Sequence, residues 1–287
     1  MPPEAFIFVH AHPDDETLWT GGLIATAAAS GARVVVVTCT RGERGEVLTV
    51  PGTATEHLGF LADDGEALGA YRTTELRAAL NALGPTIEHH YLDELPTTNY
   101  DDAPTRHSGV WRAATQPGTS SLASLGTMYR DSGMAWIAPG LAGPDPRFTG
   151  GFASVPVAEA ASRLVPLIRD AKRASGRVVV VTYGPDGGYG HPDHVHAHRV
   201  AASAVNLANN DAVQLWEIAT DGDIKVPVEP VLVKVLTALR AYPSQIQNIK
   251  LASASDGAEG VLAWFELSNA VPQPIRAHEA YRLRTSA

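Results

Sequence analysis

Apolar and polar positions follow two different periodicities along most of the chain. Short runs of Val, Ile, Leu and Phe, typical of strands buried on both faces, are separated by segments with apolar residues at helical spacing. The predicted strands are residues 5–9, 33–39, 87–92, 177–183 and 213–218. The predicted helices are residues 18–30, 74–83, 155–174, 192–207 and 231–241, and Gly31 is a natural stop for the first of them.

Alternating strands and helices with Val-rich strands predict an α/β, Rossmann-like fold, in which helices flank a mainly parallel sheet. Residues 96–151 interrupt this alternation, because they are rich in Gly, Pro, Ser and Thr and lack a sustained period. We interpret them as a long loop insertion or lid and not as a second domain. Apart from one helix, the signals after residue 220 are weaker. We therefore expect residues 1–220 to form the core, including the insertion, and residues 221–287 to complete the same domain.

Composition and charge narrow the possible partners and the location. The 287 residues are 45% hydrophobic and carry a formal net charge of -9, which does not attract nucleic acid or an anionic membrane surface. The apolar runs are too short to span a membrane, and no basic segment precedes a cleavable apolar stretch. We therefore expect a cytoplasmic protein without nucleic-acid or membrane partners. The single cysteine, Cys39, lies in an apolar run and is interpreted as a buried core thiol.

The first polar cluster, AHPDDE at residues 11–16, directly follows a predicted strand. His12 and Asp15 are three residues apart and share one side if a helix begins there. Asp14 and Asp15 are adjacent and must point in different directions, so one can bind a metal while the other stays free. Either aspartate could instead cap the following helix. A cap does not explain one histidine and three acids within residues 12–16.

The second cluster, GPDGGYGHPDHVHAH at residues 184–198, follows another predicted strand. Its glycines allow the backbone to approach a ligand closely, and His191 and His194 are again three residues apart. Ligands of parallel α/β sheets bind beyond the carboxyl ends of the strands, so the two clusters can meet at one site. Two imidazoles, a carboxylate and an open water position are typical of a hydrolytic zinc site.

Other histidines and other classes of protein fit the pattern less well. We expect His196 and His198 to lie on a packed or solvated helix face, and His89 and His90 to be structural. A dinucleotide-binding oxidoreductase would fit the fold, but no G-x-G-x-x-G follows the first strand. A sugar-binding protein with a structural metal is a further alternative. It would not need a free carboxylate such as that of Asp14 beside three ligands.

In this order and at strand ends, AHPDDE and HPDH resemble the LmbE/PIG-L family of zinc-dependent N-acetylglucosaminyl deacetylases. The segments VVVVTCTRGERGEV, LGAYRTTELRAAL, YRDSGM and VVTYGPDGGYGHPDHVHAH are similar to the branch of this family that acts on N-acetylglucosaminyl-inositol in mycothiol biosynthesis. The matching segments cover most of residues 6–201. The resemblance implies metal-dependent hydrolysis of the N-acetyl group of a small amino-sugar substrate. Mycothiol-conjugate amidases and deacetylases of secondary-metabolite amino sugars are the alternatives within the family.

The resemblance also implies roles for individual residues. His12, Asp15 and His194 match the metal ligands, Asp14 matches the general base, and His191 matches the residue that stabilises the oxyanion or protonates the leaving amine. The remaining matches are Tyr189 near the acetyl carbonyl, Asp193 as the acid that orients His191, and four residues on the substrate side of the pocket, Arg72, Asp131, Glu46 and Met134. Zinc is the expected ion, although such a ligand set also accepts iron, cobalt or manganese.

The chain departs from the family pattern in residues 97–126, where the insertion is longer than we expect, and in its C-terminal part. The family often has a His within an H-x-[ST]-Q stretch in its C-terminal part, and this chain has Tyr242-Pro243-Ser244-Gln245 there. We expect this difference to change the side of the pocket that lies far from the acetyl group.

Overall fold

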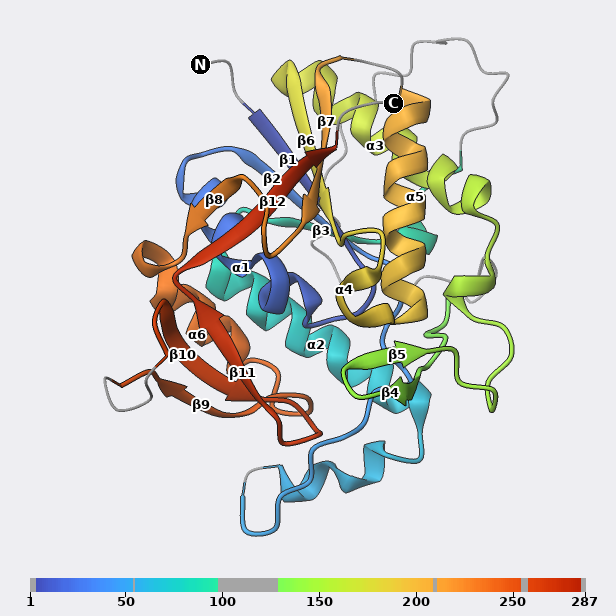
Figure 1. Cartoon of the computed structure of the whole chain (residues 1–287). Helices are drawn as coiled ribbons and strands as arrows, with labels where there is room; N and C mark the ends of the chain where they lie inside the picture. Colours follow the sequence, from blue (N-terminus) through green and yellow to red (C-terminus); the bar gives the residue numbers. More distant parts are fainter. Residues whose placement is uncertain (1–3, 54, 98–128, 209–210, 254–257, 285–287) are drawn as a thin grey trace.

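A seven-stranded sheet forms the centre of the molecule, with the strand order β3-β2-β1-β6-β7-β12-β8 (Figure 1). The computed structural model describes residues 4–53, 55–97, 129–208, 211–253 and 258–284. Residues 98–128, the larger part of the predicted insertion, therefore lie outside the described residues. The five parallel strands are β1 (Glu4–His10), β2 (Arg33–Thr38), β3 (Glu88–Tyr91), β6 (Arg177–Thr182) and β7 (Val213–Ile218).

Helices cover both faces of this sheet, so both faces of its strands are apolar. The face formed by Ile7, Val35 and Val180 packs against α3 (Val157–Ser175) and α5 (Pro192–Ala208). The opposite face, formed by residues such as Phe8 and Val36, packs against α1 (Asp15–Ala29), α2 (Gly65–Leu83) and α6 (Leu232–Leu239). Figure 1 shows the two groups of helices on opposite sides of the sheet. The predicted α/β class and mainly parallel sheet are confirmed.

The C-terminal part adds strands that the sequence pattern did not predict. β8 (Ile224–Pro227) and β12 (His278–Arg284) extend the central sheet in antiparallel fashion. β9 (Gln247–Leu251), β10 (Val261–Glu266) and β11 (Pro272–Arg276) form a second, three-stranded sheet with two register shifts. These strands are short and only partly buried, which weakens the alternation of apolar and polar residues. The division of the chain at residue 220 stays a prediction.

Helix α2 begins earlier than the predicted helix at residues 74–83. It starts at Gly65, where the Asp64 side chain accepts a hydrogen bond of 3.0 Å from the amide of Ala67. The first two turns, GEALGAY, contain two glycines, which are poor helix formers and hide the start of the helix. The smaller elements are β4 (Ala135–Ala138), β5 (Leu141–Gly143), α4 (Gly187–Gly190) and the 3-10 turns Glu56–Leu61, Leu92–Glu94, Phe152–Ser154 and Glu229–Val231.

None of the helices in the described ranges combines the length and the apolar character that crossing a membrane requires.

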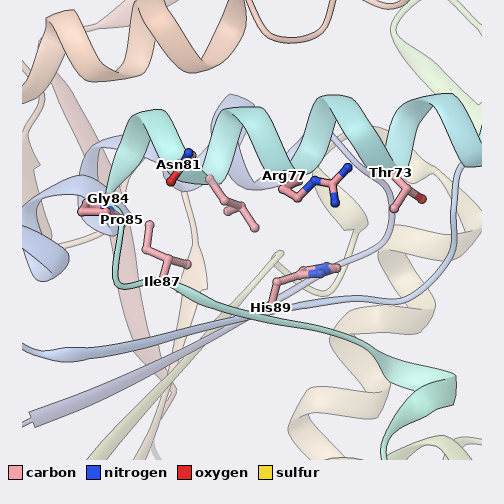
Figure 2. A pocket seen from close by; sticks show the side chains of 8 residues that line it. Thr73, Arg77, Asn81, Gly84, Pro85, Ile87 and His89 are labelled. Carbon is pink, nitrogen blue, oxygen red and sulfur yellow. The ribbon is translucent and has the colours of Figure 1, made fainter. Parts of the chain in front are cut away.

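A cavity of about 390 Å³ lies between α2 and the edge strand β3. In Figure 2, Thr73 and Arg77 extend from α2 and His89 extends from β3 into this space. The His89 ring is hydrogen-bonded to the Thr38 hydroxyl at 3.0 Å. Burial lowers the pKa of His89 to about 3, and the charges of His90 and Arg41 act in the same direction. His89 is therefore a neutral structural residue, as its position in a strand predicts.

This low pKa predicts a measurable dependence of stability on pH. Below the ordinary histidine pKa of about 6.5 the unfolded state binds a proton that folded His89 does not, so the free energy of unfolding falls between pH 6.5 and pH 3. We expect His89→Asn to remove about 2 kcal/mol of that loss at pH 5. Urea unfolding of both proteins at pH 7.5 and pH 5 measures the difference. An equal loss of stability in the two proteins would contradict this assignment.

Candidate metal and catalytic site

The two polar clusters meet at the carboxyl ends of β1 and β6, which are neighbours in the sheet. The chain leaves β1 through His12 and enters α1 at Asp15, and it leaves β6 through a Gly-rich loop that ends in α5. The amide of Ala11 donates a hydrogen bond of 2.9 Å to the Tyr183 hydroxyl, which ties the two loops together. The parallel pairing of β1 and β6 thus brings His12 and His194 into one site.

The three predicted ligands, His12, Asp15 and His194, are buried and in contact. Oδ2 of Asp15 lies 3.2 Å from Nδ1 of His12 and 3.4 Å from Nε2 of His194. Burial opposes ionisation of Asp15, but the nearby His194 and His12 hold the pKa of this carboxyl well below its usual value. Asp15 is therefore an ionised carboxylate between two imidazoles.

The donor set fits a zinc ion. Tetrahedral zinc with bonds of about 2.0–2.1 Å separates its ligand atoms by roughly 3.3–3.4 Å. His194 Nδ1 donates to the carbonyl of Gly187 at 3.1 Å, which leaves a lone pair on Nε2. That Nε2 atom is buried and has no hydrogen-bond partner. A hydrogen bond from one ring nitrogen to a backbone carbonyl and a buried lone pair on the other nitrogen are typical of a metal-binding histidine.

Two sets of donors overlap at this position. Donor atoms of His12, His191 and His194 lie within 4.8 Å of one another, and so do those of His12, Asp131 and Asp193. His12 belongs to both sets, and neither set includes Asp15. The specific choice of Asp15 as the third ligand stays a prediction.

Asp14 lies beside these ligands with a free carboxylate. It occupies the N-cap position of α1, but its side chain makes no capping hydrogen bond, so the alternative interpretation as a helix cap is wrong for this residue. Its Oδ2 accepts a hydrogen bond of 3.0 Å from Nη2 of Arg72. Burial raises the pKa of Asp14 to about 8, an effect that the charge of Arg72 opposes. A carboxylate with a raised proton affinity suits a general base.

His191 is oriented by the backbone of Asp193. The amide of Asp193 donates to Nδ1 of His191 at 3.1 Å, so the neutral ring carries its hydrogen on Nε2. Burial and the neighbouring His12 hold the pKa of His191 well below its ordinary value. The carboxylate of Asp193 instead accepts from the amides of Ser132 and Ala153 at 2.8 and 3.1 Å. It also lies 3.3 Å from Nε2 of His12.

Asp131 is built into the same site. Its Oδ1 lies 3.6 Å from Nε2 of His12 and accepts from the amide of Gly133 at 2.7 Å. Met134 is partly buried and immediately precedes β4. The exposed Trp136 of that strand lies against Tyr189, with 5.8 Å between ring centroids. The ring centroid of Tyr189 lies 5.2 Å from that of His194, so Tyr189 borders the candidate metal site.

Arg72 and Glu46 differ in their surroundings. Arg72 is buried, and its two terminal nitrogens donate to Asp14 and to the carbonyl oxygens of Pro13 and Gly42. Only Nε of Arg72 is buried without a hydrogen-bond partner. Glu46 is exposed, and its carbonyl oxygen accepts a hydrogen bond of 3.0 Å from Gln245. The structure thus brings Arg72, but not the Glu46 side chain, into contact with the predicted base.

Sequence reasoning missed two residues that contact this site. Glu16 accepts a hydrogen bond from the amide of Asp14, and Tyr242 donates a hydrogen bond to Glu16. The AHPDDE motif itself could have indicated Glu16, because it carries one more acid than the ligand and the base require. Tyr242 lies far away in the sequence and had only its departure from the family pattern as a signal.

His196 and His198 are structural, as expected from their place on α5. The ring of His196 packs edge-on against Phe152 with 4.7 Å between centroids. His198 contacts Glu217 at 2.8 Å and lies close to Arg284.

Two solved structures share this fold at low sequence identity. N,N'-diacetylchitobiose deacetylase from Pyrococcus horikoshii has a TM-score of 0.55 and 16% identity, over 99% of this chain and 84% of that one. GalB, the 4-carboxy-2-hydroxymuconate hydratase from Pseudomonas putida KT2440, has a TM-score of 0.52 and 14% identity, over 99% and 97% of the two chains. The names describe different reactions, so this similarity establishes the fold alone.

Relatives in sequence are much closer. A protein from Saccharopolyspora erythraea named 1D-myo-inositol 2-acetamido-2-deoxy-alpha-D-glucopyranoside deacetylase 1 is 36% identical over 99% of this chain and 90% of its own length. A deacetylase of the same name, without the final numeral, from Actinosynnema mirum is 35% identical over 98% of this chain and 92% of its own.

The family match spans both polar clusters. Residues 7–205 match PIG-L, described as GlcNAc-PI de-N-acetylase, and this range includes the motifs around His12 and His194. The resemblance predicted from those motifs is confirmed. The chain belongs to the PIG-L family of de-N-acetylases.

Proposed function

We propose that this protein is a zinc-dependent hydrolase that removes the N-acetyl group of 1D-myo-inositol 2-acetamido-2-deoxy-alpha-D-glucopyranoside and releases acetate. The observation that carries the proposal is Asp14, a buried carboxylate held by Arg72 beside the three proposed ligands. The relatives with this substrate in their names match nearly the whole chain, which supports the choice of substrate.

His12, Asp15 and His194 would hold the ion. When bound, zinc supplies Lewis acidity that lowers the pKa of water toward about 7. Asp14 accepts the proton of the attacking water, because its carboxylate is next to the proposed ligands and is paired with Arg72. This proton transfer turns a weak nucleophile into one that can attack the acetyl carbonyl.

His191 acts on the carbonyl oxygen of the substrate, whereas Asp14 acts on the attacking water. With Nδ1 engaged by the amide of Asp193, its Nε2–H is the group that can donate to the developing oxyanion. One such donor typically contributes several kcal/mol to the transition state. Asp14 then gives the proton that it took from water to the nitrogen of the amino sugar as the C–N bond breaks, which leaves acetate and the free amine.

We assign Asp131 and Met134 to the substrate side of the pocket, with Glu46 on the more exposed loop. We propose that Arg72 holds the base, Asp14, in place, since both of its terminal nitrogens donate to protein acceptors. Its remaining nitrogen, Nε, is buried.

Arg72→Ala is therefore expected to lower kcat about tenfold or more, and by similar factors for the inositol glycoside and for a small acetylated amine. Its loss leaves Asp14 and two buried carbonyls without a donor, whichever substrate is bound. Parallel kcat/KM measurements on the two substrates test this. A loss of kcat/KM more than tenfold greater for the glycoside would show that Arg72 binds the sugar.

Substrate competition tests the proposed function itself. We expect kcat/KM for the inositol glycoside to exceed that for free N-acetylglucosamine and for a mycothiol conjugate by at least a factor of about ten, which corresponds to about 1.4 kcal/mol. Acetate release and amine formation are measured for all three under the same conditions. A preference for the conjugate would assign the protein to the amidase branch instead.

A further inference from the structure

We propose that Glu16 and Tyr242 are positioning residues for Asp14, through a buried hydrogen-bonded pair that holds the main chain of the base. This inference rests on the proposed function in that it takes Asp14 as the base. The segment that contains Tyr242 would then help to fix the conformation of the AHPDDE motif at residues 11–16.

The backbone of Asp14 has a conformation that needs external support. Its φ is 106° and its ψ is -35°, and only two other described non-glycine residues have a positive φ. Such conformations persist where the surrounding contacts over-determine them, and they cluster at functional sites. A conformation of this kind allows Asp14 to point away from Asp15 although the two are adjacent.

Glu16 supplies one of these contacts. Its Oε2 accepts a hydrogen bond of 3.1 Å from the amide of Asp14, and it is fully buried. Its Oε1 accepts from the hydroxyls of Thr17 at 2.5 Å and of Tyr242 at 2.7 Å. Because both oxygens are engaged, the carboxylate cannot rotate away from the Asp14 amide without losing another hydrogen bond.

Packing and hydrogen bonds of the segment after α6 hold Tyr242 in place. It is fully buried and follows α6, which lies beside α1 (Figure 1). Two residues further on, the amide and hydroxyl of Ser244 donate to Glu75 of α2 at 2.9 and 2.6 Å. The segment Tyr242-Pro243-Ser244-Gln245 departs from the family pattern, and its tyrosine hydroxyl faces the base motif.

The chain provides a matched control for this pair. Tyr281 is also fully buried and donates to a glutamate, Glu279, at 2.6 Å. Glu279 accepts from the amides of Gly22 and Leu23 in α1, and not from Asp14. Removing either tyrosine hydroxyl therefore leaves one glutamate short of one donor, but only Glu16, the partner of Tyr242, is bonded to the amide of Asp14.

The test compares Tyr242→Phe with Tyr281→Phe in the zinc-loaded full-length protein. We expect Tyr242→Phe to lower kcat on the inositol glycoside about tenfold, with KM and zinc affinity within twofold of the parent. Tyr281→Phe is expected to keep kcat within twofold, although both variants lose stability to urea. A similar kcat in the two variants, or zinc loss confined to Tyr242→Phe, would overturn the proposal.

Hydrogen exchange of the Asp14 amide gives a second readout that needs no substrate. We expect this amide to exchange at least tenfold faster in Tyr242→Phe than in the parent and in Tyr281→Phe. Unchanged exchange would overturn the positioning role even if kcat fell. If the parent protein does not hydrolyse the glycoside, the proposed function fails, while the exchange rates still decide whether Tyr242 holds Asp14. Should Tyr242→Phe not fold, Glu16→Gln is measured in the same way, with the same expected results.

Discussion

The Asp14→Asn protein is expected to bind zinc as tightly as the parent and to hydrolyse the inositol glycoside between about 10²- and 10⁴-fold more slowly, the range that general-base catalysis contributes. Asparagine has the same shape and can still accept a hydrogen bond from Arg72, whose Nη2 lies 3.0 Å from the Asp14 carboxylate. It cannot accept the proton of water. Zinc content and kcat are measured on the same preparation.

Asp64→Asn is a suitable control for this change. Asp64 caps α2 at the protein surface and takes no part in the metal site, so its variant should keep both zinc and kcat. If Asp14→Asn lost its zinc, Asp14 would be a ligand. If it kept near-normal turnover, another group would be the base.

His194→Ala is expected to lower zinc affinity by more than 10–100-fold, the loss that typically follows removal of a group that only hydrogen-bonds to a metal ligand. Its Nε2 is buried without a hydrogen-bond partner and lies 3.4 Å from Oδ2 of Asp15. Turnover should disappear in parallel and return only in part at high zinc concentrations. Competition with a chelator of known affinity measures the change.

His196→Ala is the matched control, because it removes an imidazole from the same helix. His196 packs against Phe152 and not against the ligands, so this variant should bind zinc like the parent. Unchanged affinity in His194→Ala would place the ion on the alternative set of His12, Asp131 and Asp193.

The strands and helices of the parallel half could be predicted because each shows its own pattern of apolar residues within a short segment of sequence. Strands such as β2 and β6 have the sequence RVVVVT, which favours burial on both faces. The antiparallel C-terminal strands could not be predicted in this way. β9, β10 and β11 are short and mostly only partly buried, and the register shifts in β10 break the simple alternation.

The candidate site divides along the same line. The pairs of His12 with Asp15 and of His191 with His194 are visible as spacings of three residues, and the carboxyl ends of parallel strands bring them together. Contacts between elements leave no such pattern. The side chain of Arg72 reaches Asp14 from α2, and that of Tyr242 reaches Glu16 from beyond α6, so only the folded chain reveals what holds the base.

Acetate release during a zinc titration of the chelator-stripped protein tests the central claim most directly. With the inositol glycoside as substrate, activity should be absent from the stripped protein, rise in proportion to bound zinc, and reach its maximum at about one equivalent, as a single catalytic site requires. Full acetate release by the metal-free protein, or none after one equivalent of zinc has bound, would contradict the assignment of a zinc-dependent deacetylase.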